Sequence, residues 1–451
     1  MIHKYALNGF NIVLDVNSGG VHIVDDAVFA LLDFVKPPLS SNLSEDIALS
    51  LNSFSREELD DAYSEIKDLF DQGILFSEDS YEKYADMMTS APIKAMCLHI
   101  AHDCNLRCKY CFASTGDFGE GRKLLSEQTG KEAIDFLLKY SNGRKNIELD
   151  FFGGEPLMNF DVVKKVVEYA RSKEKEYNKN FRFTITTNGV LLDDDITDFI
   201  NKEMSNVVLS LDGRKQVNDT LRQTPNQKGS YDLIVPKFQD LVKKRGDKDY
   251  YVRGTFTKHN LDFSNDVMHL NELGFDQISV EPVVADEKME YALTKDDLPV
   301  IFKEYENLAL KLIEKKKNKQ GFNFFHFMID LDQGPCAIKR LRGCGCGNEY
   351  VAVTPDGDIY PCHQFVGMTQ WKMGDVHTQT IDMEKKKYFA NANIYSKEEC
   401  KSCWAKFYCS GGCNANNLQY AGDIHNPHKL SCELQKKRLE CAIMVKAALA
   451  D

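Results

Sequence analysis

From residue 95 onward, short apolar segments alternate with longer amphipathic ones. Continuous apolar runs predict buried strands, and apolar residues that recur every three or four positions predict helices. Strand and helix alternation of this kind predicts an α/β domain with a parallel sheet, closed into a barrel or an incomplete one. The predicted strands are 96–101, 147–152, 181–187, 206–211, 250–257 and 277–283, and the helices are 126–140, 161–176, 194–203, 231–245, 264–273 and 296–317.

The loops that follow these strands are rich in glycine and polar residues. In a parallel barrel such loops lie at one face, where ligands bind. One glycine after a strand is usually only a turn, but four loops of this kind at strand ends predict a ligand site. They are Gly153-Gly154-Glu155-Pro156, Thr186-Thr187-Asn188-Gly189, Ser210-Leu211-Asp212-Gly213 and Val280-Glu281-Pro282.

Residues 1–88 have a different pattern and form a separate predicted domain. A hairpin signal at Asn17-Ser18-Gly19-Gly20 joins two predicted strands, and three amphipathic stretches follow. This combination predicts a small winged-helix-like module. Its strands are placed at 4–16 and 21–25, its helices at 27–35, 44–51 and 55–72, and a short returning strand at 74–76.

The charge of this module decides between two kinds of partner. Residues 1–80 carry four Lys or Arg and fifteen Asp or Glu, and the whole chain has a formal net charge of −12. A nucleic-acid backbone would be repelled, so no nucleic-acid partner is expected. A peptide that adds a strand to an exposed sheet edge is favoured instead, with a purely structural role as the alternative.

The expected location of the protein indicates what its cysteines do. The start of the chain has no signal-peptide pattern, and no stretch of eighteen apolar residues occurs, so a cytoplasmic protein without membrane association is expected. Cysteines in a reducing compartment favour metal binding or catalysis over disulfides. Of the fourteen, four lie at 97–111 and ten at 336–441, which predicts two metal-binding regions.

The run CNLRCKYC, at residues 104–111, directly follows the first strand of the predicted sheet. It supplies three thiolates, one fewer than a closed tetrahedral site needs. A zinc site would require a fourth protein ligand, whereas thiolates also suit an iron–sulfur cluster that keeps one iron for another ligand.

With Gly-Gly-Glu-Pro after the second strand, this run resembles the radical S-adenosylmethionine (SAM) enzymes. The resemblance implies a partial (β/α)6 radical SAM barrel at 89–325. It also implies that Cys104, Cys108 and Cys111 form the catalytic centre by holding a [4Fe-4S] cluster whose fourth iron binds SAM. The residues implied to contact SAM are Tyr110, Gly154, Glu155, Thr187, Asn188, Ser210 and Arg222.

The cysteines of residues 326–451 follow the pattern C-x2-C-x5-C-x3-C-x18-C, preceded by Gly357-x4-Cys362. The first pair alone would favour zinc, but the whole pattern resembles the cysteine-rich SPASM extension of radical SAM enzymes. The resemblance implies two auxiliary [4Fe-4S] clusters, and three clusters in the whole chain. One is assigned to Cys400, Cys403, Cys409 and Cys432, and the other to Cys344, Cys362 and Cys413.

Four cysteines stay outside these sets: Cys97, Cys336, Cys346 and Cys441. Relatives commonly have a residue that is not a ligand where this chain has Cys346. The candidates for the fourth position beside Cys344 are Cys336, Cys346 or a thiolate of the substrate. Cys97 and Cys441 are predicted to be buried structural thiols.

The N-terminal module separates the possible reactions. It resembles a precursor-peptide recognition domain, and nearly the whole chain resembles the SCIFF peptide maturases, which join a cysteine sulfur to an α-carbon as a thioether of the sactionine type. Anaerobic sulfatase-maturing enzymes typically have an aspartate after Tyr-Pro-Cys, where this chain has His363. The implied partners are a cysteine-rich precursor peptide, whose leader the N-terminal domain binds, and an electron donor such as flavodoxin or ferredoxin.

Two alternatives belong to other classes. The first is a radical SAM enzyme that forms carbon–carbon links or oxidises a protein Cys or Ser. The second is an iron–sulfur sensor without catalysis, against which the acidic N-terminal module and the intact Gly-Gly-Glu-Pro loop argue.

Overall fold

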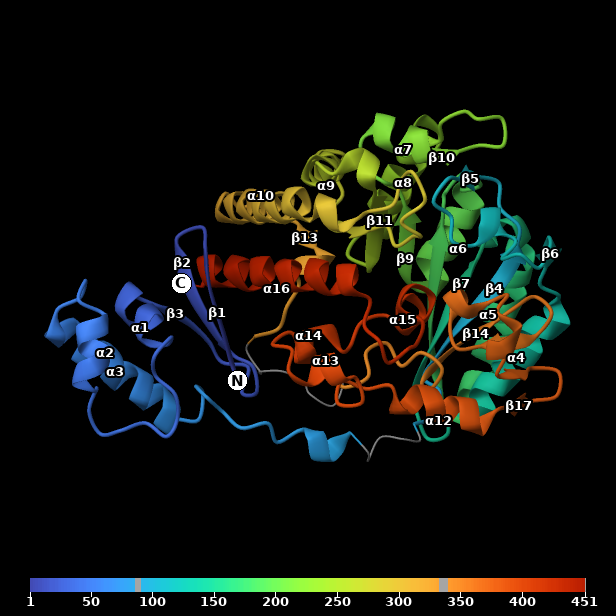
Figure 1. Ribbon diagram of the computed structural model, residues 1–451. Coiled ribbons are helices and arrows are strands. Elements are labelled where there is room, and N and C mark those ends of the chain that lie inside the picture. The colour runs from blue at the N-terminus through green and yellow to red at the C-terminus, as the bar shows by residue number, and fades with distance from the viewer. Residues whose placement is uncertain (86–90, 332–339, 451) are drawn as a thin grey trace.

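The computed structural model describes residues 1–85, 91–331 and 340–450. A central sheet of parallel strands carries helices on its outer side, and a small N-terminal module lies beside the C-terminal helix (Figure 1). This is the predicted α/β fold, with an open sheet in place of a closed barrel.

The N-terminal module is a three-stranded antiparallel sheet in the order β1-β2-β3, with three helices and its own apolar core. The helix starts are capped by side chains, as in α3, where Ser55 and Glu58 form a capping box. Its elements are β1 (Ile2–Leu7), β2 (Phe10–Asp15), β3 (Val21–Val24), α1 (Asp26–Leu31), α2 (Glu45–Ser50) and α3 (Arg56–Asp71).

Two predictions for this module are wrong. The predicted strand 4–16 is a hairpin of β1 and β2, because Asn8 and Gly9 both take positive φ values and turn the chain back. No strand forms at residues 74–76, where Phe76 has a φ of 56°, a value that does not fit a strand. The hairpin predicted around Asn17–Gly20 is confirmed by the antiparallel pairing of β2 with β3.

In the central domain, the parallel strands follow one another in the sheet in chain order, and the connecting helices cover them. Both predicted sets of elements are confirmed to within two residues at each end. The strands are β4 (Ala95–His102), β7 (Asn146–Gly153), β8 (Asn180–Thr187), β9 (Met204–Ser210), β11 (Tyr250–Phe256) and β12 (Gln277–Pro282). The predicted helices are α4 (Glu127–Tyr140), α5 (Phe160–Tyr177), α6 (Asp194–Glu203), α8 (Tyr231–Arg245), α9 (Phe263–Glu272) and α10 (Leu298–Lys317), and α7 (Lys215–Leu221) is a further helix that was not predicted.

Four two-residue strands complete this part of the chain. They are β5 (Arg107–Cys108), β6 (Lys123–Leu124), β10 (Arg222–Gln223) and β13 (Asn323–Phe324). The pairing of β5 with β10 brings Arg222 opposite Cys108, although 114 positions separate them in the sequence.

The C-terminal part does not stand apart from the barrel. Its strand β14 pairs in parallel with β4, so Ala352 lies beside Cys97, and β15 to β17 extend the same sheet. The elements are β14 (Tyr350–Val353), β15 (Asp358–Tyr360), β16 (Gly374–Asp375), β17 (Thr380–Ile381), α12 (Met383–Asn391), α13 (Glu398–Lys401), α14 (Lys406–Cys409), α15 (Asn414–Ala421) and α16 (Lys429–Leu449).

Helix α16 connects all three parts. It packs along α10, with an ion pair of 2.7 Å between Lys437 and Glu306. On its other side it receives β1: the Tyr5 hydroxyl donates to the Glu440 carbonyl at 2.9 Å. The His3 ring stacks on Trp404 at 3.8 Å, so the N-terminal module is held against the cysteine-rich part.

Candidate functional site

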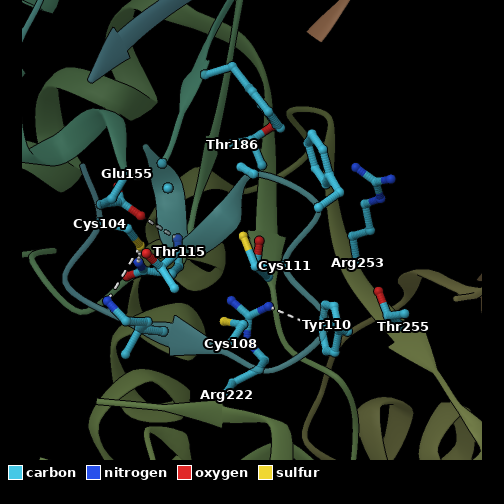
Figure 2. A pocket seen from close by; sticks show the side chains of 18 of the residues that line it. Cys104, Cys108, Tyr110, Cys111, Thr115, Glu155, Thr186, Arg222, Arg253 and Thr255 are labelled. Atoms are coloured by element: carbon cyan, nitrogen blue, oxygen red, sulfur yellow. Dashed lines mark hydrogen bonds between the residues drawn. The ribbon is translucent and has the colours of Figure 1, made fainter. Parts of the chain in front are cut away.

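The loops at the carboxyl ends of the parallel strands enclose a cavity of about 280 Å³. Figure 2 shows the three cysteines of the first loop around it, with Glu155 near Cys104 and Arg222 near Cys108 and Tyr110. Parallel strands place their following loops at one edge, which explains why segments far apart in sequence meet here. All ten residues predicted for the catalytic centre and SAM line this cavity: Cys104, Cys108, Cys111, Tyr110, Gly154, Glu155, Thr187, Asn188, Ser210 and Arg222.

The thiols of the first loop lie in an environment that disfavours a bare thiolate. Burial raises the pKa of Cys104 to about 12 and that of Cys108 to about 11, and the neighbouring cysteines contribute in the same direction. A metal that binds these sulfurs therefore displaces protons. Among the described residues, no three His, Cys, Asp or Glu side chains converge as ligands of one ion. An iron–sulfur cluster does not require this, because each cysteine binds a different iron.

Glu155 is buried, and three neighbouring groups donate hydrogen bonds that stabilise the charged form of its carboxylate. It is 1% exposed, and its two oxygens accept from the backbone N–H groups of Leu157 at 3.0 Å and Asn188 at 2.8 Å. The Thr187 hydroxyl donates to it at 2.8 Å. Burial nevertheless raises the pKa of Glu155 to about 7. A cationic ligand in the cavity would lower the pKa of Glu155 again and stabilise its charged form, so this site fits an ammonium group.

Arg222 faces the cavity from the opposite side. Its Nη1 donates to the Tyr110 hydroxyl at 2.9 Å, and that hydroxyl donates to both Asp212 oxygens at 2.8 Å. The Nε of Arg222 is buried without a hydrogen-bond partner among the described residues. A buried donor of this kind fits a carboxylate ligand.

The remaining predicted side chains also meet at the first loop. The Asn188 amide donates to the Asn105 side chain at 2.8 Å and lies 3.6 Å from the Cys104 sulfur. Ser210 lines the cavity at the end of β9. Together with Glu155 and Arg222, this donor set fits SAM, which carries an ammonium, a carboxylate and a polar nucleoside.

Three cavity residues, Arg253, Thr255 and Glu281, and the buried Asp212 behind them were not predicted as site residues. Asp212 holds Tyr110 and accepts the Thr255 N–H at 3.1 Å, and Arg253 forms an ion pair with Glu281 at the cavity wall. Asp212 follows β9 and Glu281 lies at the end of β12, both within the polar strand-end segments of the sequence, so that signal was present there. Arg253 and Thr255 lie within β11, where alternation alone does not show which side faces the cavity.

One auxiliary set of cysteines is brought together near the start of α16. Burial raises the pKa of Cys400 to about 12 and that of Cys432 to about 11. The pKa of Cys400 is also raised by the nearby charges of Cys409, Cys432 and Cys403. The pKa of Cys432 is raised in the same way by Cys409 and Cys403. The structure thus groups the four residues that the sequence assigned to one cluster.

The second auxiliary set lies between β14, β15 and α15. Cys362 is buried, Cys413 is half-buried and Cys344 is exposed. Burial and the nearby charges of Cys362 and Cys344 raise the pKa of Cys413. Cys346 is buried in the same group, while Cys336 lies outside the described residues. Cys97 and Cys441 are buried, at 1% and 0% exposure.

Gly154 allows the second loop to touch the first. A Cβ at this position would lie 2.2 Å from the Asp103 carbonyl oxygen, and this oxygen accepts the Glu155 N–H at 2.9 Å. We expect Gly154→Ala to push the backbone before Cys104 out of place, with a loss of about 1–3 kcal/mol in the free energy of unfolding.

Denaturant unfolding and iron content per chain measure this effect. Gly143→Ala is the matched control, because a Cβ there meets no atom within 4 Å. Equal behaviour of the two variants would contradict the proposed close approach.

Comparison with known proteins agrees with this geometry. The family model described as a 4Fe-4S single cluster domain matches residues 95–235, and the SPASM model, an iron–sulfur cluster-binding domain, matches residues 344–404. A relative named radical SAM cyclopropyl synthase TigE, from Paramaledivibacter caminithermalis, is 21% identical over 95% of this chain and 91% of its own.

This chain is a radical SAM enzyme with a SPASM domain.

Two solved structures show the same fold. The structure of anSMEcpe with bound AdoMet covers 79% of this chain and 98% of its own, with a TM-score of 0.66 and 21% identity. Streptococcus suis SuiB bound to S-adenosylmethionine covers 94% of this chain and 97% of its own, with a TM-score of 0.51 and 18% identity. Because the SuiB structure covers 94% of this chain, the match includes most of this chain's N-terminal module. Within the described residues, no helix is long and apolar enough to cross a membrane.

Proposed function

We propose that the enzyme matures a ribosomally made, cysteine-rich peptide by joining a cysteine sulfur to an α-carbon of another residue. The observation that carries this proposal is the N-terminal module: in the described parts of the chain no strand pairs with the outer side of β3, and the module is held against the cysteine-rich domain and α16. The proposed domains are 1–88 for peptide recognition, 89–325 for the radical SAM barrel and 326–451 for the SPASM domain.

The cavity residues would hold the cofactors in the following way. Cys104, Cys108 and Cys111 bind a [4Fe-4S] cluster, Glu155 accepts from the SAM ammonium, and Arg222 donates to the SAM carboxylate. Cluster and SAM, when bound, supply the radical that removes a hydrogen atom from the peptide. The two auxiliary cysteine groups hold a second and a third [4Fe-4S] cluster, and a flavodoxin or ferredoxin delivers electrons.

The residue after Cys362 argues against oxidation of a protein Cys or Ser by the sulfatase-maturing route. His363 stands there instead of an aspartate, with its ring 5.1 Å from that of Phe152 and 5.4 Å from that of Phe112. Burial lowers the pKa of His363 to about 4, so the imidazole is neutral at physiological pH. No carboxylate base is available from this position.

Carbon–carbon bond formation is the second candidate, because the relative that aligns over 95% of this chain is named a cyclopropyl synthase. The reactions differ in the fate of the substrate thiols. The test is anaerobic incubation of reconstituted enzyme with SAM, reductant and the cysteine-rich peptide encoded beside its gene.

Thioether formation predicts loss of two hydrogens and one alkylatable thiol per event, together with 5′-deoxyadenosine. Deoxyadenosine and a modified peptide with all thiols free would favour the carbon–carbon reaction. No deoxyadenosine from fully iron-loaded enzyme, with several candidate peptides, would favour the sensor.

Leader binding is proposed at β3, the outer strand of the N-terminal sheet. Among the described residues no strand pairs with its free side. Val21 and Ile23 of β3 line a groove whose other wall includes Phe324 and Val445. An extended peptide can add a strand there and place apolar side chains in the groove. The acidic module favours a neutral or basic leader.

Ile23→Asp tests this docking surface. Ile23 is 51% exposed, so the change costs little folding energy but puts a carboxylate into the groove. We expect leader affinity to fall at least about tenfold, with peptide-independent SAM cleavage unchanged. Fluorescence anisotropy of a labelled leader peptide measures the change.

Leu49→Asp is the matched control, since Leu49 is a 73% exposed apolar residue on α2, outside the groove. Equal loss of affinity in both variants would point to general charge repulsion and contradict docking at β3.

A further inference from the structure

The loop that carries Cys344 and Cys346 is fastened to the strand end that carries Cys362. The Gly347 N–H donates to the Pro361 carbonyl at 3.0 Å and to the Tyr350 carbonyl at 2.9 Å. The Gly345 carbonyl accepts from the N–H groups of Glu349 at 2.8 Å and Tyr350 at 3.0 Å. These bonds leave the loop little freedom and place residue 346 beside residue 362.

Cys346 is buried together with other cysteines of this region. It is 3% exposed and packs in one apolar cluster with Cys362 and Cys413. The pKa of its thiol is raised by Cys362 first, then by burial and by the nearby charges of Cys344 and Cys413. A fourth cysteine thus lies in the region where the sequence pattern assigned three.

We propose that Cys346 is the fourth protein ligand of the auxiliary cluster held by Cys344, Cys362 and Cys413. This inference rests on the proposed binding of a [4Fe-4S] cluster by those three residues. Four thiolates are the complete ligand set of such a cluster. The resting site is then closed by the protein and presents no open iron to the thiol of the peptide.

The other buried thiol of this region does not meet the same conditions. Cys97 lies on β4 opposite Ala352, and the pKa of its thiol is raised first by burial, with the smallest effect from Cys362. Its neighbours also include Asp150, a carboxylate unfavourable beside thiolates. Cys346 lies two positions from Cys344, on a loop fastened to Pro361 beside Cys362, which distinguishes it from Cys97 on the sheet.

The experiment uses full-length protein in which Cys104, Cys108 and Cys111 are replaced by alanine, so that only the auxiliary clusters contribute signals. Potassium cyanide serves as the probe of an open iron, and reduced samples are followed by electron paramagnetic resonance. With Cys346 intact, we expect g-values that cyanide leaves unchanged. In Cys346→Ala and Cys346→Ser, cyanide should shift the signal of one cluster, with an apparent affinity at least about tenfold higher.

The matched control is Cys97→Ala, which removes a buried thiol from the same apolar cluster and should leave the spectra unresponsive to cyanide. Cys336→Ala is tested in parallel. Cyanide binding with all cysteines 336–441 intact, an unchanged response in both Cys346 variants, or a cyanide response in Cys336→Ala alone would each overturn the proposal.

Cys362→Ala separates this inference from the cluster assignment beneath it. Loss of about four irons per chain, with the signal of the other cluster retained, is expected if the site holds a [4Fe-4S] cluster. No loss of iron in Cys362→Ala would refute the cluster itself, whatever the role of Cys346.

Discussion

Cys108→Ala should abolish the formation of 5′-deoxyadenosine from SAM. The rate should fall about a thousandfold or more, which corresponds to at least about 4 kcal/mol of lost transition-state stabilisation. Cys108 lies at the cavity wall beside Cys111 and opposite Arg222, and two remaining thiols cannot hold three irons of a cluster. The measurement is deoxyadenosine per chain under anaerobic reducing conditions, with iron content determined on the same sample.

Cys441→Ala is the control for this prediction. Cys441 is fully buried in α16, away from the cavity, so its loss tests the removal of a buried thiol without removal of a proposed ligand. We expect full SAM cleavage and unchanged iron in this variant. Substantial deoxyadenosine from Cys108→Ala would show that the radical centre is not built on the CNLRCKYC loop.

Glu155→Gln should raise the Kd for SAM about 10- to 100-fold, the range expected for loss of a hydrogen bond to a charged group. The reason is twofold. Glutamine has no charge for the ammonium of SAM, and its amide nitrogen cannot accept from the N–H of Leu157 or Asn188, which donate to opposite oxygens of Glu155. Equilibrium binding of SAM to iron-loaded enzyme measures the change, with iron content expected to stay the same.

Glu148→Gln provides the comparison on the same strand. Glu148 lies on β7 with its side chain exposed, outside the cavity. It should bind SAM with unchanged affinity. If both variants bound SAM equally well, the proposed contact of Glu155 with the ammonium would be refuted.

The elements of the central domain could be predicted because each strand is either a continuous apolar run or an alternation of apolar and polar residues, and each helix has one apolar face. β4 is buried along its whole length, whereas β7 alternates buried residues with Glu148 and Asp150, and both patterns indicate a strand. The N-terminal hairpin was missed for a local reason. Residues 4–16 are apolar enough to read as one strand, and the Asn8-Gly9 turn, which needs positive φ at both residues, was not given its full weight.

The residues predicted to bind the cluster and SAM could also be found from the sequence, because they follow strands that end at one face. Their hydrogen-bond partners could not be found in this way. Tyr110 was assigned a contact with SAM, and the structure shows in addition that its hydroxyl connects Arg222 with Asp212. That contact depends on the pairing of β5 with β10, two-residue strands too short to leave a periodic signal.

The sequence by itself therefore determined the parallel α/β domain, the loops that carry the chemistry and the thiols that are available, because strand periodicity and cysteine spacing are local properties. Only the tertiary structure decided how these parts meet. It joined β14 to β4, so that the cysteine-rich part continues the barrel sheet, and it held β1 against α16. It also brought Cys346 to Cys362, from a position that spacing alone did not distinguish from Cys336. Such contacts arise from packing between distant segments, and packing leaves no fixed period in the chain.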